Sequence, residues 1–172
     1  VLKSKLLGHK DMVNDIAISP DGKWIVSASR DETLKFWSIK KGKGILEEPM
    51  GHDDIVTSCT FSPDGQILAS TSWDHDIKLW DAASGRELDT FGGNLIAFSP
   101  DGKWIVSGSK DSGSIEDYTL KIRDKPNKRL SRKLTGHKKG VNDCAISPDG
   151  QWILSASNDK TLKVWDAASG RE

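Results

Sequence analysis

Histidine, serine and aspartate recur together in this chain, and in one arrangement they are the residues of a hydrolytic active site. Three of the four histidines precede a serine by 18 positions, and an aspartate follows that serine four positions later. Three such sets occur: His9, Ser27 and Asp31; His52, Ser70 and Asp74; and His137, Ser155 and Asp159. A nucleophilic serine needs an exposed hydroxyl, an adjacent base and an oxyanion hole. Three equivalent sets at fixed positions do not fit one catalytic centre, so we expect no enzymatic activity.

The densest group of potential metal ligands is Asp74, His75 and Asp76. Successive residues of a strand point to opposite faces, so these three side chains do not easily converge on one ion. No glycine-rich phosphate loop leads into a helix. We therefore expect no metal and no cofactor.

The elements that carry these residues are set by an internal repeat. Two nearly identical blocks end 85 residues apart, at Glu87 and at Glu172. His9 and His52 lie 43 positions apart, and so do Trp37 and Trp80. Repeats of this length indicate a repeat architecture rather than separate domains. We expect one domain over residues 1–172, with repeats at about 8–50, 51–91, 92–135 and 136–172.

Composition narrows the class of protein. The chain has 25 basic and 25 acidic residues, which argues against the basic surface that nucleic-acid binding needs. It lacks an apolar run near the ~20 residues of a membrane helix. Cys59 and Cys144 share one register of two repeats, which favours small buried residues over a disulfide. We expect a cytoplasmic protein that binds neither nucleic acid nor membrane. Because Val1 is not an initiator methionine, the chain is expected to be processed, excerpted or engineered.

Within a repeat the apolar pattern is that of short strands. Residues 13–18 alternate and stop at Ser19-Pro20-Asp21-Gly22, a sequence typical of a turn. Further strands are predicted at residues 24–27, at 34–37 and around 45–47. Each repeat thus supplies about four antiparallel strands, and no stretch shows the apolar stripe of a long helix.

These repeats resemble the WD-repeat β-propeller family over all 172 residues. The resemblance lies in three elements: Gly-His at Gly8, Gly51 and Gly136; the four Ser-Pro-Asp-Gly turns; and the strand ends Phe36-Trp37, Leu79-Trp80-Asp81 and Val164-Trp165-Asp166. It implies an all-β fold, a β-propeller of four-stranded antiparallel blades with four blades in this chain. The near-identical copies also suggest a recently amplified, bacterial-type array.

The resemblance gives the recurring polar residues a structural role. In the family, a His, a Ser, a turn Asp and a Trp are hydrogen-bonded across each blade. Here the implied tetrads are His9, Ser27, Asp31 and Trp37; His52, Ser70, Asp74 and Trp80; and His137, Ser155, Asp159 and Trp165. Removing one partner of such a buried network costs about 1–3 kcal/mol.

The third repeat departs from the others. Its Gly-His is missing, Arg123 replaces the tryptophan, and about six extra residues lie around 112–118. With Asp111 taken as the turn aspartate, that blade should be the least stable. The extra segment is either drift of a surface loop or a modification that meets a partner.

The family mostly binds proteins or peptides through the loop face around the central channel. By resemblance the contact positions, apart from the glycine at position 140, are Met12, Asn14, Arg30, Ile55, Thr57, Trp73, Asn94, Lys110, Asn142 and Asn158. Trp73 has no aromatic counterpart in the other repeats. An exposed aromatic near a cation is typical of a binding hot spot, although Trp73 could instead cap the channel or pack on Ile55.

The assembly and the function each leave alternatives open. Residues 1–7 are expected to form the outer strand that completes the last blade, within one chain or between two. We expect two half-rings to pair as a homodimer into an eight-bladed propeller; a four-bladed ring and a fragment of a longer propeller are the alternatives. The expected function is a non-catalytic protein or peptide-interaction scaffold. The alternative is a regulatory or sensory segment of a larger polypeptide that carries an enzyme or ATPase domain.

Overall fold

The computed structural model describes residues 5–40, 50–108, 117–124 and 130–172. These residues form β-strands and turns and contain no helix. They include no segment with the length and apolar character of a membrane-crossing helix. The chain divides into two compact units, Val1–Phe91 and Gly92–Glu172.

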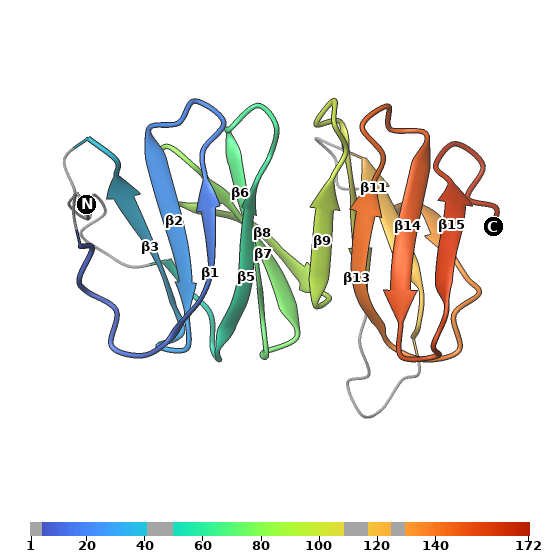
Figure 1. The fold of residues 1–172 in the computed structure, drawn as a ribbon, viewed down its shortest axis with the longest axis horizontal. Helices are drawn as coiled ribbons and strands as arrows, with labels where there is room; N and C mark the ends of the chain where they lie inside the picture. The colour runs from blue at the N-terminus through green and yellow to red at the C-terminus, as the bar shows by residue number, and fades with distance from the viewer. Residues whose placement is uncertain (1–4, 41–49, 109–116, 125–129) are drawn as a thin grey trace. The chain divides into compact units, whose positions relative to one another are not determined.

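Each unit contains two antiparallel sheets (Figure 1). In the first unit, the first sheet has the order β1 (Val13–Ile18), β2 (Trp24–Ser29), β3 (Thr33–Ser38) and β4 (Met50–Gly51). The second sheet has the order β5 (Val56–Phe61), β6 (Ile67–Ser72), β7 (Asp76–Asp81) and β8 (Glu87–Gly92).

In the second unit, the third sheet has the order β12 (Leu130–Leu134), β11 (Leu120–Asp124), β10 (Trp104–Gly108) and β9 (Leu95–Phe98). The fourth sheet contains three strands among the described residues: β13 (Val141–Ile146), β14 (Trp152–Ser157) and β15 (Leu162–Asp166). All-β architecture with antiparallel blade-like sheets is therefore confirmed.

The Ser-Pro-Asp-Gly turns fold as their residue types predict. In the first of them the Gly22 amide donates to the Ser19 carbonyl at 2.8 Å, and the Ser19 hydroxyl donates to the Asp21 carboxylate at 2.6 Å. Gly22 has a φ of 68°, in the left-handed region that glycine adopts without strain. The hydrogen bond from Ser19, followed by those from Lys23, lowers the pKa of Asp21 to about 2.

Each unit has its own apolar core between its two sheets. In the first unit Val26, Leu34 and Phe36 of the first sheet pack with Val56 and Cys59 of the second. In the second unit an equivalent cluster joins the third sheet to the fourth. The sheets are thus stacked in pairs by the side chains of one face.

Two predicted strands, around residues 45–47 and in residues 1–7, fall wholly or partly outside the described residues. The strand expected around residues 45–47 lies outside the described residues, and β4 at Met50–Gly51 pairs with Thr33 and Leu34 instead. Residues 5–7 belong to no strand, and residues 1–4 are not described. The completion of the last blade by residues 1–7 therefore stays a prediction.

Candidate functional site

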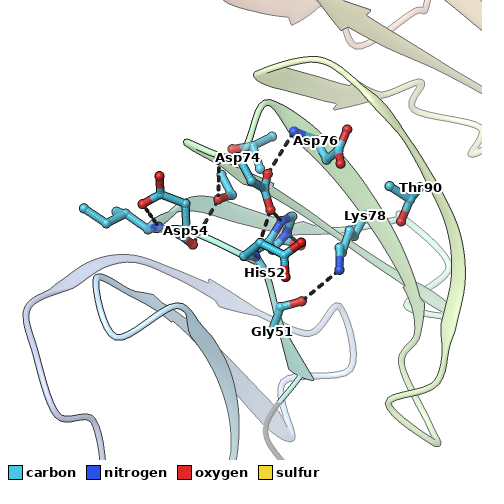
Figure 2. A network of polar contacts seen from close by, with 12 residues as sticks. Gly51, His52, Asp54, Asp74, Asp76, Lys78 and Thr90 are labelled. Carbon is cyan, nitrogen blue, oxygen red and sulfur yellow. Dashed lines mark hydrogen bonds and ion pairs between the residues drawn. The ribbon is translucent and has the colours of Figure 1, made fainter.

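The structure brings together the His, Ser, Asp and Trp side chains of three repeats. In the second sheet, His52 Nδ1 lies 2.7 Å from Asp74 Oδ2 and His52 Nε2 lies 2.7 Å from Ser70 Oγ. The Trp80 indole N–H donates to the same serine oxygen at 2.8 Å. Figure 2 shows His52 beside Asp74.

The other two sets repeat this geometry. His9 lies 2.9 Å from Asp31 and 2.6 Å from Ser27, and Trp37 donates to Ser27 at 2.8 Å. The third set has the corresponding distances 2.8, 2.7 and 2.9 Å; its members are His137, Asp159, Ser155 and Trp165. Each histidine ring also meets its tryptophan edge to face, with ring centroids 6.0 to 6.2 Å apart.

This arrangement has the order Asp, His, Ser of a hydrolytic triad but lacks what a nucleophile needs. All three serines are buried, and each serine oxygen already accepts a hydrogen bond from an indole N–H. A substrate carbonyl therefore cannot approach the hydroxyl without breaking the core.

Electrostatics fix the protonation of the second set. Burial lowers the pKa of His52, which favours the neutral ring. Partial burial raises the pKa of Asp74, but hydrogen bonds from the Asp76 amide and from His52 outweigh it and lower that pKa overall. A neutral His52 that donates from Nδ1 to ionised Asp74 and accepts at Nε2 from Ser70 satisfies all three groups.

The turn aspartates also accept hydrogen bonds from two loops at the same end of the sheet. Asp31 Oδ2 accepts from the Lys10 amide at 2.8 Å, and Asp31 Oδ1 accepts from the Thr33 hydroxyl at 2.6 Å. The segment before β1 and the turn between β2 and β3 are thus held at one end of the sheet. Asp159 makes the same contacts with Lys138 and Thr161.

The third sheet has a different turn aspartate from the one expected. Asp117 accepts from the Thr119 amide at 3.2 Å and from its hydroxyl, as Asp31 does from Thr33. Asp111, which counting from Ser107 predicts for this role, lies outside the described residues, and so does Lys110. The sequence Asp-x-Thr-Leu-Lys, shared by Asp31, Asp117 and Asp159, was the signal that could have identified Asp117.

Missing partners leave buried polar atoms in the third sheet. Ser107 occupies the place of Ser27, Ser70 and Ser155, because it pairs with Lys121 as Ser27 pairs with Lys35. Its hydroxyl is buried and has no hydrogen-bond partner among the described residues. The same holds for Asn94 Oδ1.

In the first, second and fourth sheets, predicted contact positions come together in pairs at one end of the sheet. The Arg30 amide donates to the Met12 carbonyl at 2.9 Å, and the Trp73 amide donates to the Ile55 carbonyl at 3.0 Å. The Asn158 amide likewise donates to the carbonyl of residue 140. Side chains at several of these positions are exposed, including Trp73, which is 57% exposed.

Other contact positions are engaged within the structure. Asn14 Nδ2 donates to the Val56 carbonyl at 2.8 Å, which joins the first sheet to the second. Thr57 and Thr71 hydroxyls lie 2.9 Å apart, and Asn142 donates to Asn158 at 2.7 Å. Asn94 is held through its main chain, whose N–H donates to the Gly108 carbonyl at 3.0 Å, and its side-chain Oδ1 is buried. The pairs Met12 with Arg30 and Ile55 with Trp73 therefore offer the most available side chains.

Neither cysteine forms a disulfide, as the sequence predicts. Burial raises the pKa of both thiols to about 12, so they are unreactive at neutral pH. Among the residues that the structure describes, no group of three His, Cys, Asp or Glu side chains could hold a metal ion.

Comparison with known proteins adds a family model, the WD domain, G-beta repeat (WD40), which matches residues 1–38, 45–81, 94–124 and 128–166. A 38-residue segment is 50% identical to Transcriptional repressor tup12 of Schizosaccharomyces pombe, covering 22% of this chain and 6% of that protein. A 42-residue segment is 48% identical to Ribosome assembly protein 4 of Saccharomyces cerevisiae, covering 24% of this chain and 8% of that protein. Ribosome biogenesis protein bop1-A of Xenopus laevis is 47% identical over 36 residues, or 21% of this chain and 5% of that protein.

The chain thus spans well under two thirds of the length of these relatives. All three are eukaryotic, so the expectation of a bacterial-type array gains no support from them.

Proposed function

The chain belongs to the WD40 repeat family, and on that premise we propose that it is a non-catalytic scaffold that binds a protein or peptide partner. The observation that carries this proposal is the exposed Trp73 beside Ile55, on a sheet that packs against the one holding Met12 and Arg30. An exposed aromatic with a neighbouring apolar side chain and a cation is the composition of an interaction hot spot.

Geometry places the two pairs at corresponding ends of neighbouring sheets. Val13 pairs with Ser29 and Val56 pairs with Ser72, so Met12 and Ile55 each precede the first strand at the same register. The Asn14 side chain bonds to the Val56 carbonyl and fixes these ends beside each other. A peptide with an apolar anchor and a carboxylate fits this surface, since Trp73 and Arg30 supply the complementary chemistry.

A selection from a random peptide library tests this function. Peptides are selected on the wild-type chain, and their affinity is then measured for the Trp73→Ala, Arg30→Ala double variant. We expect the affinity to fall by at least about tenfold. Equal affinity for both chains would exclude this surface.

Two control variants make the result specific. Trp73→Phe keeps an aromatic ring and should retain most of the affinity. Lys103→Ala removes an exposed charge from the third sheet and should leave binding unchanged.

The assembly is part of the same proposal. We propose that the four sheets of one chain form a half-ring and that two chains pair into an eight-bladed propeller. The three-stranded fourth sheet supports this, since among the described residues no strand pairs with the outer edge of β15. Residues 1–7 are the segment proposed to complete it.

Two further points stay proposals. The alternative function, a regulatory segment of a larger polypeptide with an enzyme or ATPase domain, is compatible with relatives of which the matched part is only 5–8%. The full reading frame would decide it. A cytoplasmic location is supported by two free thiols, Cys59 buried and Cys144 partly buried, which suit a reducing compartment.

A further inference from the structure

Neighbouring sheets within each unit pack by one rule. Side chains from the second and third strands of one sheet cover the first strand of the next. In the first unit Val26, Leu34 and Phe36 cover the β5 side chains Val56 and Cys59. Phe36 also meets Phe61 of β5 edge to face, with ring centroids 6.1 Å apart.

The second unit repeats the rule with equivalent residues. Val106, Leu120 and Ile122 of the third sheet cluster with Val141 of β13, and Cys144 and Ile146 pack against the same core. Register establishes the equivalence, because Cys59 pairs with Ser70 and Cys144 pairs with Ser155. Val56 and Val141 are both fully buried by this packing.

The first sheet carries the same apolar positions without a cover. Val13, Ile16 and Ile18 of β1, here called the entry face, correspond to Val56, Cys59 and Phe61 of β5. All three are exposed, and Ile16 is 60% exposed.

The fourth sheet carries the equivalents of the side chains that, in the first sheet, cover the first strand of the next sheet. Leu154, Leu162 and Val164, here called the exit face, correspond to Val26, Leu34 and Phe36. Leu34 is buried in the first unit, whereas Leu162 is 77% exposed. Trp152 beside them is also exposed, although its counterpart Trp104 packs against the core of its unit.

We propose that the exit face of one copy of this chain binds the entry face of a second copy. The contact would repeat the packing already present twice within the chain, with the second copy in the place of the next sheet. Leaving both faces in water keeps several large apolar side chains exposed, and their burial favours association. This proposal rests on the half-ring pairing above and names the surfaces that make it.

Polar groups on the fourth sheet fit the same contact. Asn14 donates to the Val56 carbonyl of the next sheet at 2.8 Å. Its counterpart Asn142 bonds instead to Asn158 in its own sheet, at 2.7 Å. In the paired state Asn142 is placed to donate to the Val13 carbonyl of the second copy, which corresponds to that of Val56.

One position opposes the contact. Asp15 Oδ2 accepts from Ser58 Oγ at 2.7 Å and from the Cys59 amide at 3.0 Å. Asp15, Ser58 and Asp143 occupy the same register of β1, β5 and β13. In the proposed pair Asp143 therefore corresponds to Asp15 of the first unit. The residue that it faces is Asp15 of the second copy, at the position that corresponds to Ser58. Two carboxylates in this place repel each other, so the interface is weaker than the one within a unit.

Sedimentation equilibrium over a range of concentrations tests the proposal. The wild-type chain should associate beyond its 18.9 kDa monomer. Ile16→Asp on the entry face and Leu162→Asp on the exit face should each weaken association by at least about tenfold. Both side chains are exposed in the single chain, so the variants should fold, which circular dichroism checks.

Mixing the two variants shows whether the faces bind each other. Each variant retains one intact face, so an equimolar mixture should form a heterodimer through a single contact. Monomeric wild-type chain with an intact sheet spectrum would overturn the proposal, as would variants that associate like wild type or a mixture that stays monomeric.

Measuring self-association separately from peptide binding distinguishes a failure of this proposal from a failure of the proposed peptide-binding function. Trp73→Ala should lose peptide affinity and keep self-association, so each failure is distinguishable. Association into species larger than a dimer, abolished by Ile16→Asp, would support the contact and exclude the closed eight-bladed ring.

Discussion

Lys121 Nζ lies 2.7 Å from Asp117 Oδ2, where His137 lies 2.8 Å from Asp159 Oδ2. The third sheet has lost its histidine, and a lysine from the neighbouring strand supplies the missing donor. Partial burial raises the pKa of Asp117, but hydrogen bonds from Lys121 and Thr119 lower it overall. The turn aspartate of the degenerate repeat thus has a lysine in the place of the histidine donor.

Replacing this lysine should destabilise the third sheet. Lys121→Met removes the donor to Asp117 Oδ2 and leaves the hydrogen bonds from Thr119 to Oδ1. It should cost about 1 kcal/mol, since both charged groups are largely but not fully buried. Urea unfolding measures the change. Lys103→Met, which removes an exposed pair with Asp101, should have an effect close to zero. Equal effects of the two variants would contradict the role of Lys121.

The serine of a complete tetrad should matter more than the serine of the third sheet. Ser70→Ala leaves His52 Nε2 and the Trp80 indole N–H without a partner and should cost about 2–3 kcal/mol. Ser107→Ala removes a buried hydroxyl with no partner among the described residues and should be neutral or slightly stabilising. Urea midpoints of the two alanine variants compare the sites directly, and similar losses would count against the tetrads as structural networks.

Glycine should be tolerated after a turn aspartate. Lys160 has a φ of 70°, a backbone conformation that costs a residue with a Cβ about 1 kcal/mol more than glycine. Lys160→Gly should therefore raise stability by about 0.5–1 kcal/mol in thermal unfolding. Lys133→Gly within β12 is the control and should lower stability. A loss at position 160 would show that its side chain makes a contact that offsets the strain.

Acid should destabilise the second sheet in two stages. Burial lowers the pKa of His52 below its usual 6.5, so the folded chain binds this proton less readily than the unfolded chain. The stability that this group contributes is complete above pH 6.5 and is lost as the pH falls below it. Asp74 also has a lowered pKa, so its contribution is present above pH 3.8 and is lost on further acidification.

Urea midpoints between about pH 7 and about pH 2.5 test both signs, that of His52 below pH 6.5 and that of Asp74 below pH 3.8. His52→Gln should be less stable at neutral pH and should show a flatter dependence in the upper part of the range. An unchanged slope in that variant would exclude His52 as a contributor.

Removing one carboxylate should strengthen self-association. Asp143→Asn keeps an acceptor for the Cys144 amide and abolishes the repulsion proposed between Asp143 and Asp15 of a second copy. The dimer dissociation constant should fall by about threefold to tenfold. Asp124→Asn removes one negative charge from the third sheet and controls for net charge. Equal effects of the two variants would attribute the change to net charge alone.

Much of the fold follows from the sequence because the repeat spacing fixes strand order and the turn residues fix strand ends. Ser19 and Gly22 form the turn that their types predict, and His52 reaches Ser70 and Asp74, the contacts that the family resemblance implies. The third repeat was harder, because an insertion moves the turn aspartate to Asp117 and counting from Ser107 points to Asp111. Local sequence next to Thr119 carried the correct answer.

Exposure of the two end faces could not be predicted from the residues. Ile16 and Cys59 occupy the same register of their strands, and Leu34 and Leu162 do likewise. The first and the last repeats carry the apolar side chains that would pack against an adjacent sheet, although no adjacent sheet of the described residues covers them. Which of these side chains are covered depends on the neighbouring sheet and not on the residue types.

The side chain of Asn142, near the start of β13, should change its hydrogen-bond partner when another sheet packs against the fourth sheet. In the first sheet the corresponding amide reaches a main-chain carbonyl across the sheet gap, whereas Asn142 turns back to Asn158. The NMR resonances of the Asn142 side-chain N–H₂ group therefore report whether another sheet is packed against the fourth sheet.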